Sequence, residues 1–124
     1  MAKAKTIIIV EDDKFLLGIL SDRFEAEGFT VIQAMNGSEA VKKTGEARPD
    51  LVLLDLILPE LNGFEVMEKL KADARTKNIP VIILSNLGSE EDMERGKKLG
   101  AVDYLVKAYF TPDEIVQKVR GAID

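Results

Sequence analysis

Short apolar runs alternate along the chain with longer segments whose apolar residues recur at helical spacing. Each short run is nearly continuous and rich in branched side chains, which is typical of strands that are buried on both faces of a sheet. The five predicted strands are residues 5–10 (KTIIIV), 29–34 (FTVIQA), 51–54 (LVLL), 80–84 (PVIIL) and 101–106 (AVDYLV).

A helix is predicted after each of these strands. The first places its apolar residues at helical spacing from Phe15 to Phe24, and Gly28 suits its end. The next three are expected from about Ser38, over 64–72 and over 89–100. The last is expected to have Thr111 as its N-cap, Pro112 at its first position and Glu114 completing a capping box.

The helix predicted over residues 89–100 has its acidic residues first and its basic residues last, an order that suits the helix dipole. Glu91 and Arg95 are four residues apart, as are Glu94 and Lys98, so both pairs are spaced to form ion pairs on the helix surface.

Five strand–helix units follow one another without a linker, an internal repeat or a second domain. The chain is therefore predicted to be a single α/β domain over residues 1–124. Continuously apolar strands that alternate with helices indicate a five-stranded parallel sheet covered on both faces, which makes three layers. In open sheets of this kind ligands bind outside the carboxyl ends of the strands, so the chemistry is expected just after each strand.

Composition excludes several kinds of chemistry. The 124 residues include no Cys and no His, which rules out disulfides, Cys/His zinc sites and Ser-His or Cys-His nucleophile pairs. The net charge is −5 and the basic residues are scattered, so no direct contact with nucleic acid is expected. After the mildly basic MAKAKT segment, IIIV is too short for a signal peptide core or a membrane span. A cytoplasmic location is the expectation.

Acidic residues stand at the ends of two predicted strands. Glu11, Asp12 and Asp13 follow the first, and Asp55 interrupts the apolar run that ends the third. Carboxylates that are brought together without compensation repel one another, and a hard divalent cation such as Mg²⁺ removes this cost. Asp12, Asp55 and the backbone carbonyl of Ile57 would be its ligands, and Glu11 would act directly or through water.

Ser85 and Lys107 follow the fourth and fifth predicted strands. A hydroxyl and a fixed positive charge suit the oxygens of a transferring phosphoryl group, for which catalysis consists mainly of positioning and charge neutralisation. Asp55 would then be the nucleophile and form an aspartyl phosphate.

Each of these features also has a simpler explanation. An EDD run before a helix is usually an N-cap with acids that match the dipole, and Asp13 is expected to be that cap. Asp55 alone would be a loop cap, and a lone Ser or Lys at a strand end is more often solvated surface. The combination favours a site, because the acidic pair, Asp55, the hydroxyl and the lysine each follow a different strand at one edge of the sheet.

The chain resembles the receiver domain of two-component response regulators over essentially its full length. The resemblance is carried by IIIVEDD, LVLLDLILPELNGFE, VIILS and GAVDYLVKAYF. It implies a flavodoxin-like, CheY-like doubly wound (βα)5 fold. It also implies a signalling switch in which Asp55 accepts a phosphoryl group from a histidine kinase or a histidine phosphotransfer protein. The reaction would depend on Mg²⁺, with Mn²⁺ as a possible substitute, and would change contacts with a downstream protein.

The resemblance also assigns roles to the other residues. Glu11 and Asp12 match the acidic metal-site pair, Ser85 the switch hydroxyl, and Lys107 the phosphate-binding lysine. Tyr104 matches the switch aromatic that turns inward when the hydroxyl is drawn to the phosphoryl group. A strand residue half buried against the last helix is the alternative explanation for Tyr104.

The chain departs from the family pattern close to the site. Ala108 stands where a proline usually follows the lysine, so a trans bond at 107–108, or a cis bond held under strain, is expected. Ile57 and Leu87 are apolar where polar side chains can orient water, which predicts slow self-dephosphorylation. Asn86 is larger than the small residue usual there and would narrow access for the phosphoryl group.

The output of such a domain is left open by the sequence. The chain would act as a stand-alone receiver or as a receiver taken from a longer regulator. The last two predicted helices and the strand between them carry mixed charge, which would support a symmetric homodimer or simply be a solvated face. These charged residues are Glu90, Arg95, Asp103, Lys118 and Arg120.

Two other functional classes compete with the switch. A magnesium-dependent phosphohydrolase with an aspartate nucleophile would place a second acid two residues after it, but that position is Ile57. A flavin- or nucleotide-binding module would need a glycine-rich loop after the first strand, where the EDD run stands instead. The sequence therefore favours a phosphorylated switch that turns over no external substrate.

Overall fold

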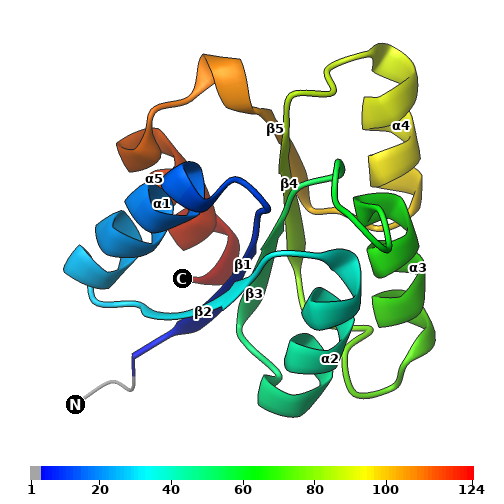
Figure 1. Cartoon of the computed structure of the whole chain (residues 1–124), viewed down its shortest axis with the longest axis horizontal. Coiled ribbons are helices and arrows are strands. Elements are labelled where there is room, and N and C mark those ends of the chain that lie inside the picture. Colours follow the sequence, from blue (N-terminus) through cyan, green and yellow to red (C-terminus); the bar gives the residue numbers. More distant parts are fainter. Residues whose placement is uncertain (1–3) are drawn as a thin grey trace.

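The computed structural model describes residues 4–124, so Met1 to Lys3 of the MAKAKT segment lie outside the described residues. Five parallel strands form one sheet in the order β2-β1-β3-β4-β5 (Figure 1). This is the predicted sheet, and its order fits the flavodoxin-like (βα)5 fold. The strands are β1 (Thr6–Val10), β2 (Thr30–Ala34), β3 (Leu51–Leu54), β4 (Val81–Ser85) and β5 (Asp103–Val106).

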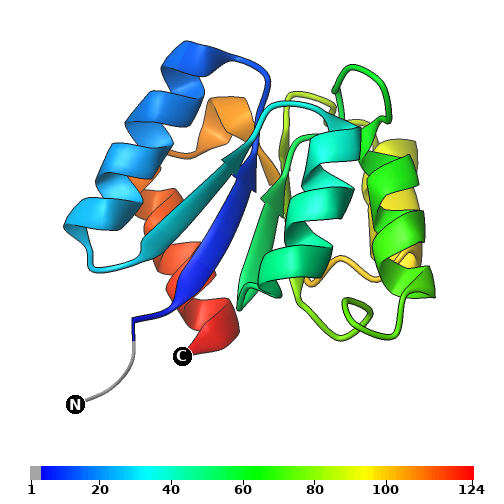
Figure 2. The same ribbon diagram turned by 60° about the horizontal axis from the view of Figure 1, so that its bottom comes forward.

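Helices cover both faces of the sheet and make the expected three layers. α1 and α5 lie together on one side, and α2, α3 and α4 lie on the other (Figures 1 and 2). A short 3-10 turn, η1, separates β5 from the last helix. The helical segments are α1 (Lys14–Ala26), α2 (Gly37–Ala47), α3 (Gly63–Ala72), α4 (Glu90–Lys98), η1 (Lys107–Tyr109) and α5 (Pro112–Ile123).

The core consists of two apolar clusters, one on each face of the sheet. Ile7 and Ile9 of β1 belong to the cluster under α1 and α5, whereas Ile8 and Val10 belong to the cluster under α2 and α3. Successive strand side chains point to opposite faces, so a strand covered on both sides must be apolar at every position. This is why the central strands β1, β3 and β4 were recognisable as nearly unbroken apolar runs.

Side-chain caps begin the helices where the sequence indicates. The Asp13 carboxylate accepts hydrogen bonds from the backbone amides of Phe15 and Leu16, which confirms it as the cap of α1. Thr111 caps α5 with Pro112 at its first position, and Glu114 completes the predicted capping box. Each such cap satisfies amides that have no partner inside the helix.

Several element boundaries differ from the predictions. The fourth strand runs one residue later than 80–84, because Pro80 has no amide proton to give to the sheet. α4 stops at Lys98 and β5 begins only at Asp103, both shorter than predicted. Gly100 has a φ of 102°, a left-handed conformation that ends the helix and turns the chain before the strand.

The side-chain contacts of α4 differ from the prediction. Neither Glu91–Arg95 nor Glu94–Lys98 is an ion pair among the described residues. Arg95 instead lies over the Phe64 ring of α3, 4.1 Å from its centroid. A guanidinium over an aromatic face gains cation–π attraction as well as contact area, which a solvated surface pair does not.

The mixed-charge face predicted around α4, β5 and α5 is also less complete than expected. The Arg120 guanidinium pairs with Glu27 at 3.5 Å and lies 5.1 Å from the Phe29 ring, so it packs against the α1–β2 connection. Arg95 and Arg120 are therefore engaged within the chain, which weakens the pattern on which the homodimer expectation was based.

Candidate functional site

The carboxyl edge of the sheet brings the predicted acidic residues together. β1 and β3 are hydrogen-bonded neighbours, so Glu11 and Asp12 at the end of one lie beside Asp55 at the end of the other. Carboxylate oxygens of the three residues lie within 4.8 Å of one another. The expected acidic cluster is present, and it lies where ligands bind in open α/β sheets.

Asp55 is almost completely buried, with a relative exposure of 4%, and its carboxylate accepts three hydrogen bonds. Its Oδ1 accepts from the backbone amides of Leu56 at 2.7 Å and Ile57 at 3.3 Å. Its Oδ2 accepts from the Lys107 ammonium at 2.8 Å. The lone charge within the apolar run is thus compensated by backbone dipoles and by a lysine that is 52 residues away in the chain.

Glu11 is as deeply buried as Asp55, whereas Asp12 beside it is exposed. The Glu11 Oε1 lies 2.6 Å from the Lys107 ammonium, and Oε2 accepts from the backbone amide of Asp13 at 3.0 Å. Burial raises the pKa of Glu11, although the hydrogen bonds from Lys107 and Asp13 oppose the increase.

The Lys107 ammonium joins these two buried carboxylates. Its burial acts to lower the pKa, but the hydrogen bonds to Asp55 and Glu11 outweigh that effect, so the pKa of Lys107 is raised. The lysine is therefore a permanent positive charge near neutral pH. No peptide bond in residues 4–124 is cis, so the Lys107–Ala108 bond is trans, the first of the two expected possibilities.

Ser85 and Tyr104 are connected through the backbone of one residue of the β4–α4 loop, Leu87. The Leu87 amide donates to Ser85 Oγ at 3.4 Å, and the Tyr104 hydroxyl donates to the Leu87 carbonyl. Ser85 is fully buried, and Tyr104 is partly buried against the cluster under α2 and α3. Burial, with smaller effects of the negative charges of Asp92 and Asp55, raises the pKa of Tyr104 to about 12.

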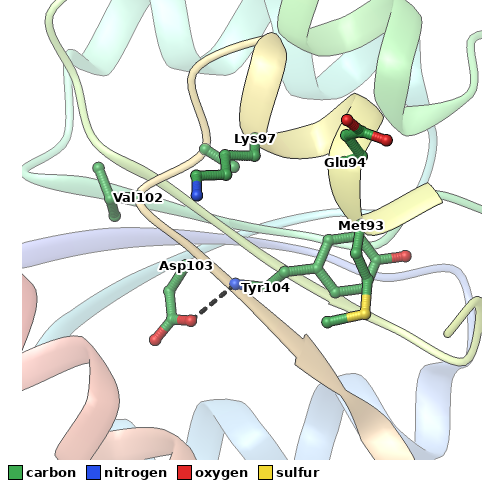
Figure 3. Close-up of a pocket in the computed structure, with 7 residues that line it drawn as sticks. Met93, Glu94, Lys97, Val102, Asp103 and Tyr104 are labelled. Atoms are coloured by element: carbon green, nitrogen blue, oxygen red, sulfur yellow. Dashed lines mark hydrogen bonds between the residues drawn. The ribbon is translucent and has the colours of Figure 1, made fainter. Parts of the chain in front are cut away.

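A cavity of about 440 Å³ lies between α4 and the start of β5, away from the acidic cluster (Figure 3). Tyr104 belongs to both places, since its ring lines the cavity while its hydroxyl bonds to the loop that follows Ser85. Its backbone amide donates to the Asp103 carboxylate at 2.8 Å (Figure 3). The lining residues are Met93, Glu94, Lys97, Ala101, Val102, Asp103 and Tyr104.

Some contacts of the site were missed by the sequence reasoning. The Glu11–Lys107 ion pair was not expected. The backbone link from Ser85 through Leu87 to Tyr104 was not expected either, because backbone contacts leave no signal in residue type. Ile57 was expected to offer its carbonyl to a metal ion. Its amide donates to Asp55, and the role of its carbonyl remains a prediction.

A parallel (βα)5 sheet with buried, lysine-bound carboxylates at its carboxyl edge defines a small phosphoacceptor signalling domain. Comparison with known proteins supports this class: the response regulator receiver domain model matches residues 7–120. The chain belongs to the response regulator receiver domain family of two-component systems. It is a receiver domain and not a classical enzyme.

Curated proteins are similar to this chain in sequence. RpaA of Synechocystis, a DNA-binding dual master transcriptional regulator, is 38% identical over 117 residues, which cover 94% of this chain and 48% of RpaA. PhoB of Escherichia coli, the phosphate regulon transcriptional regulatory protein, is 36% identical over 120 residues, which cover 97% and 52%. The chain thus spans about half the length of the curated relatives it matches.

Solved structures share the fold over nearly the whole chain. A putative response regulator from Chloroflexus aurantiacus has a TM-score of 0.90 at 30% identity, with 98% of each chain covered. The CheX–CheY–BeF3–Mg²⁺ complex from Borrelia burgdorferi has a TM-score of 0.88 at 29% identity, with 97% of this chain and 90% of that one covered.

Proposed function

We propose that Asp55 is the residue that accepts the phosphoryl group. The observation that carries the proposal is its carboxylate, which is buried at a strand end with Oδ1 held by two backbone amides and Oδ2 by Lys107. A carboxylate oxygen attacks phosphorus, the bond from phosphorus to the donor nitrogen or oxygen breaks, and its electron pair leaves with the donor group. Lys107 is placed to neutralise charge on the phosphoryl oxygens.

The acidic cluster fits a hard divalent cation. Three carboxylates lie together and a single ammonium contacts two of them, which leaves an excess of negative charge, and all the available ligands are oxygens. Asp12 and Asp55, with the Ile57 carbonyl and Glu11 directly or through water, would hold Mg²⁺ or, as a substitute, Mn²⁺. When bound, the ion neutralises charge on the transferring phosphoryl group. A CheY bound to Mg²⁺ among the structural relatives supports this assignment.

Ser85 and Tyr104 are the proposed switch residues. When Asp55 carries the phosphoryl group, the Ser85 hydroxyl turns toward it and gives up its bond with the Leu87 amide. The loop then releases the Tyr104 hydroxyl, whose present partner is the Leu87 carbonyl. Because Tyr104 lines the cavity beside α4, its movement would alter a surface that a downstream protein can read.

The partners follow from the chemistry of the acceptor. The donor would be a phosphohistidine of a histidine kinase or of a phosphotransfer protein, since this chain has no His of its own. RpaA, of which the match covers 48%, is named as a DNA-binding regulator, whereas direct contact of this chain with nucleic acid is not expected. No helix in residues 4–124 is long and apolar enough to cross a membrane. The cytoplasmic location and the homodimer remain predictions.

A small-molecule phosphodonor tests the acceptor directly. Intact mass is recorded after incubation with acetyl phosphate, with magnesium or with a chelator. We expect an adduct of about 80 Da, the mass of one phosphoryl group, that needs magnesium and is removed by hydroxylamine. Asp55→Asn should abolish it, and Asp22→Asn, at an exposed acid of α1, should keep it. An adduct that survives in Asp55→Asn would refute the assignment.

The same samples test the two rival classes. Multiple turnover of a small phosphate ester would favour the phosphohydrolase, and visible absorbance of the purified protein would favour the flavin-binding module. We expect neither. Ile57 supplies no general acid after the acceptor, and without a bound cation the buried carboxylates of Glu11 and Asp55 would repel a nucleotide phosphate.

A further inference from the structure

α4 has the fewest buried residues of the five helices. Of its residues Glu90–Lys98, only Gly96 is buried, and Met93 is 38% exposed. Within residues 4–124, no ion pair joins α4 to another element, and its side-chain hydrogen bonds stay within its first turn. A helix of this length is marginal on its own in water, so a few tertiary contacts must determine where it lies.

Arg95 attaches α4 to α3, the helix beside it on this face of the sheet (Figures 1 and 2). Its guanidinium carbon lies 4.1 Å from the centroid of the Phe64 ring, and Phe64 is 6% exposed. A guanidinium over an aromatic face gains cation–π attraction, and its stem adds contact area. The contact therefore fastens a poorly packed helix to a well-packed one.

Phe64 is fixed in turn to the backbone of the proposed acceptor, through the residue before it. The Gly63 amide donates to the Leu56 carbonyl at 2.9 Å. A Cβ at Gly63 would lie 2.5 Å from the Asp55 carbonyl oxygen, so the start of α3 approaches the chain at Asp55 without room for a side chain. Because close-packed groups transmit displacements, a shift of the acceptor loop is passed to the ring under Arg95.

Tyr104 contacts α4 at the residue next to Arg95. A Cβ at Gly96 would lie 3.2 Å from the Tyr104 ring, and this glycine lets the helix lie close to the ring. Two contacts from different parts of the sheet edge thus meet on adjacent residues of α4. One comes through β5 and Tyr104, and the other comes from the acceptor loop through α3 and Phe64.

We propose that the contact of Arg95 with the Phe64 ring is a latch that holds α4 against α3 and couples its position to the acceptor loop. While the latch is closed, movement of Tyr104 removes one of the two contacts and α4 stays in place. A shift of the acceptor loop moves the ring away from the guanidinium and releases the helix. The signalling role of the latch rests on the proposed function of Asp55, to which it adds a second route to α4.

Native-state hydrogen exchange of the α4 amides tests the latch without any phosphodonor. Arg95→Met removes the cation and keeps an apolar stem, whereas Lys98→Met removes an equal charge from an exposed residue of the same helix. We expect α4 to exchange about two- to fivefold faster in Arg95→Met than in Lys98→Met, because one cation–π contact at an exposed site is lost. Equal exchange in the two variants would overturn the proposal.

A double variant shows whether the aromatic ring is the partner of the guanidinium. Phe64→Leu keeps an apolar side chain without an aromatic face, and it should speed the exchange of α4 by itself. If Arg95 acts through the ring, Arg95→Met/Phe64→Leu accelerates exchange by less than the product of the two single effects. Fully multiplied effects would show that Arg95 holds α4 in another way and would overturn the latch.

The coupling to the acceptor loop is tested by repeating the exchange with acetyl phosphate and magnesium in excess. Phosphorylation should speed the exchange of α4 in wild type and in Lys98→Met, because the latch opens. In Arg95→Met the latch is already open, so phosphorylation should add a smaller fold increase. The same fold increase in Arg95→Met and Lys98→Met would overturn the coupling.

Failure of the latch and failure of the proposed acceptor give different results. No adduct on Asp55, together with faster exchange of α4 in Arg95→Met, would refute the acceptor and support the contact as the hold on α4. An adduct on Asp55, together with equal exchange in Arg95→Met and Lys98→Met, would support the acceptor and refute the latch.

Discussion

Replacing Lys107 with methionine removes one charge from the centre of the site and little volume. The ammonium compensates two carboxylates with relative exposures of 2% for Glu11 and 4% for Asp55. Without it, both stay buried near each other with only backbone amides as partners. We expect a large loss of stability at neutral pH, because removal of one partner from a buried ion pair leaves a charge without compensation.

The size of the loss follows from the geometry. The carboxylate oxygens lie within 4.8 Å of one another, and two unit charges at that separation repel by about 3 kcal/mol with an effective dielectric constant of about 20. Measured costs of breaking a buried pair are about 3–5 kcal/mol. We therefore expect Lys107→Met to lower the free energy of unfolding by about 3 kcal/mol at pH 7.

Acidification should reduce this loss. Burial already raises the pKa of Glu11 in the wild type. The stability linked to protonating this carboxyl is thus present below its unfolded value of 4.5 and is lost as pH rises through the raised value. Lys107→Met removes a contact that opposes the rise, so the pKa of Glu11 should climb further. The variant should recover part of its stability as the pH is lowered from 7 toward that pKa.

Urea unfolding followed by far-ultraviolet circular dichroism measures the loss, since the chain has no Trp. Lys42→Met, at an exposed lysine of α2, is the control and should change stability by less than about 0.5 kcal/mol. Adding Asp55→Asn to Lys107→Met should restore part of the stability by removing one of the two charges. A loss below about 1 kcal/mol for Lys107→Met, or no recovery in the double variant, would refute the electrostatic reasoning.

Three further perturbations test other parts of the structure. Gly37→Ala should lower the free energy of unfolding in urea by about 1–3 kcal/mol, because the added Cβ would lie 2.0 Å from a backbone carbonyl of the β3–α3 loop. Gly121→Ala, with open space around the added Cβ, is the control and should raise it by about 0.5 kcal/mol. In a Tyr109→Phe background, ultraviolet absorbance should show that Tyr104 ionises with a pKa of about 12. The stability linked to its neutral form is present below pH 10.0 and is lost as pH rises through about 12. Ionisation near pH 10 would contradict the burial of Tyr104. Ile57→Asn, at a side chain that is 56% exposed beside the acceptor, should speed loss of the phosphoryl group several-fold by orienting water, and unchanged or slower decay would contradict that reasoning.

The sequence determined most of the architecture by itself. Strands buried on both faces must be apolar at every position, so the runs around Ile8, Leu53 and Ile83 were visible without coordinates. Alternation of strands and helices then implied a parallel sheet, and a parallel sheet places all strand ends on one edge. That is why Asp55 and Lys107 could be assigned to one site although 52 positions separate them.

Tertiary structure decided how the site residues contact one another. The pairing of Lys107 with Glu11 depends on the reach of a side chain across the sheet edge, which residue spacing does not encode. The bond from Tyr104 to the Leu87 carbonyl uses a backbone group that every residue possesses, so no residue type could have signalled it.

The surface contacts of α4 could not be predicted from residue spacing either. Arg95 was expected to pair within its own helix, but the Phe64 ring of α3 lies 4.1 Å from its guanidinium and competes successfully for it. Local spacing ranks partners along one helix, whereas the packed structure offers partners from other elements that can win. For this protein, periodicity and burial therefore determined the sheet and the set of residues at its edge, and three-dimensional packing determined which of those residues are joined.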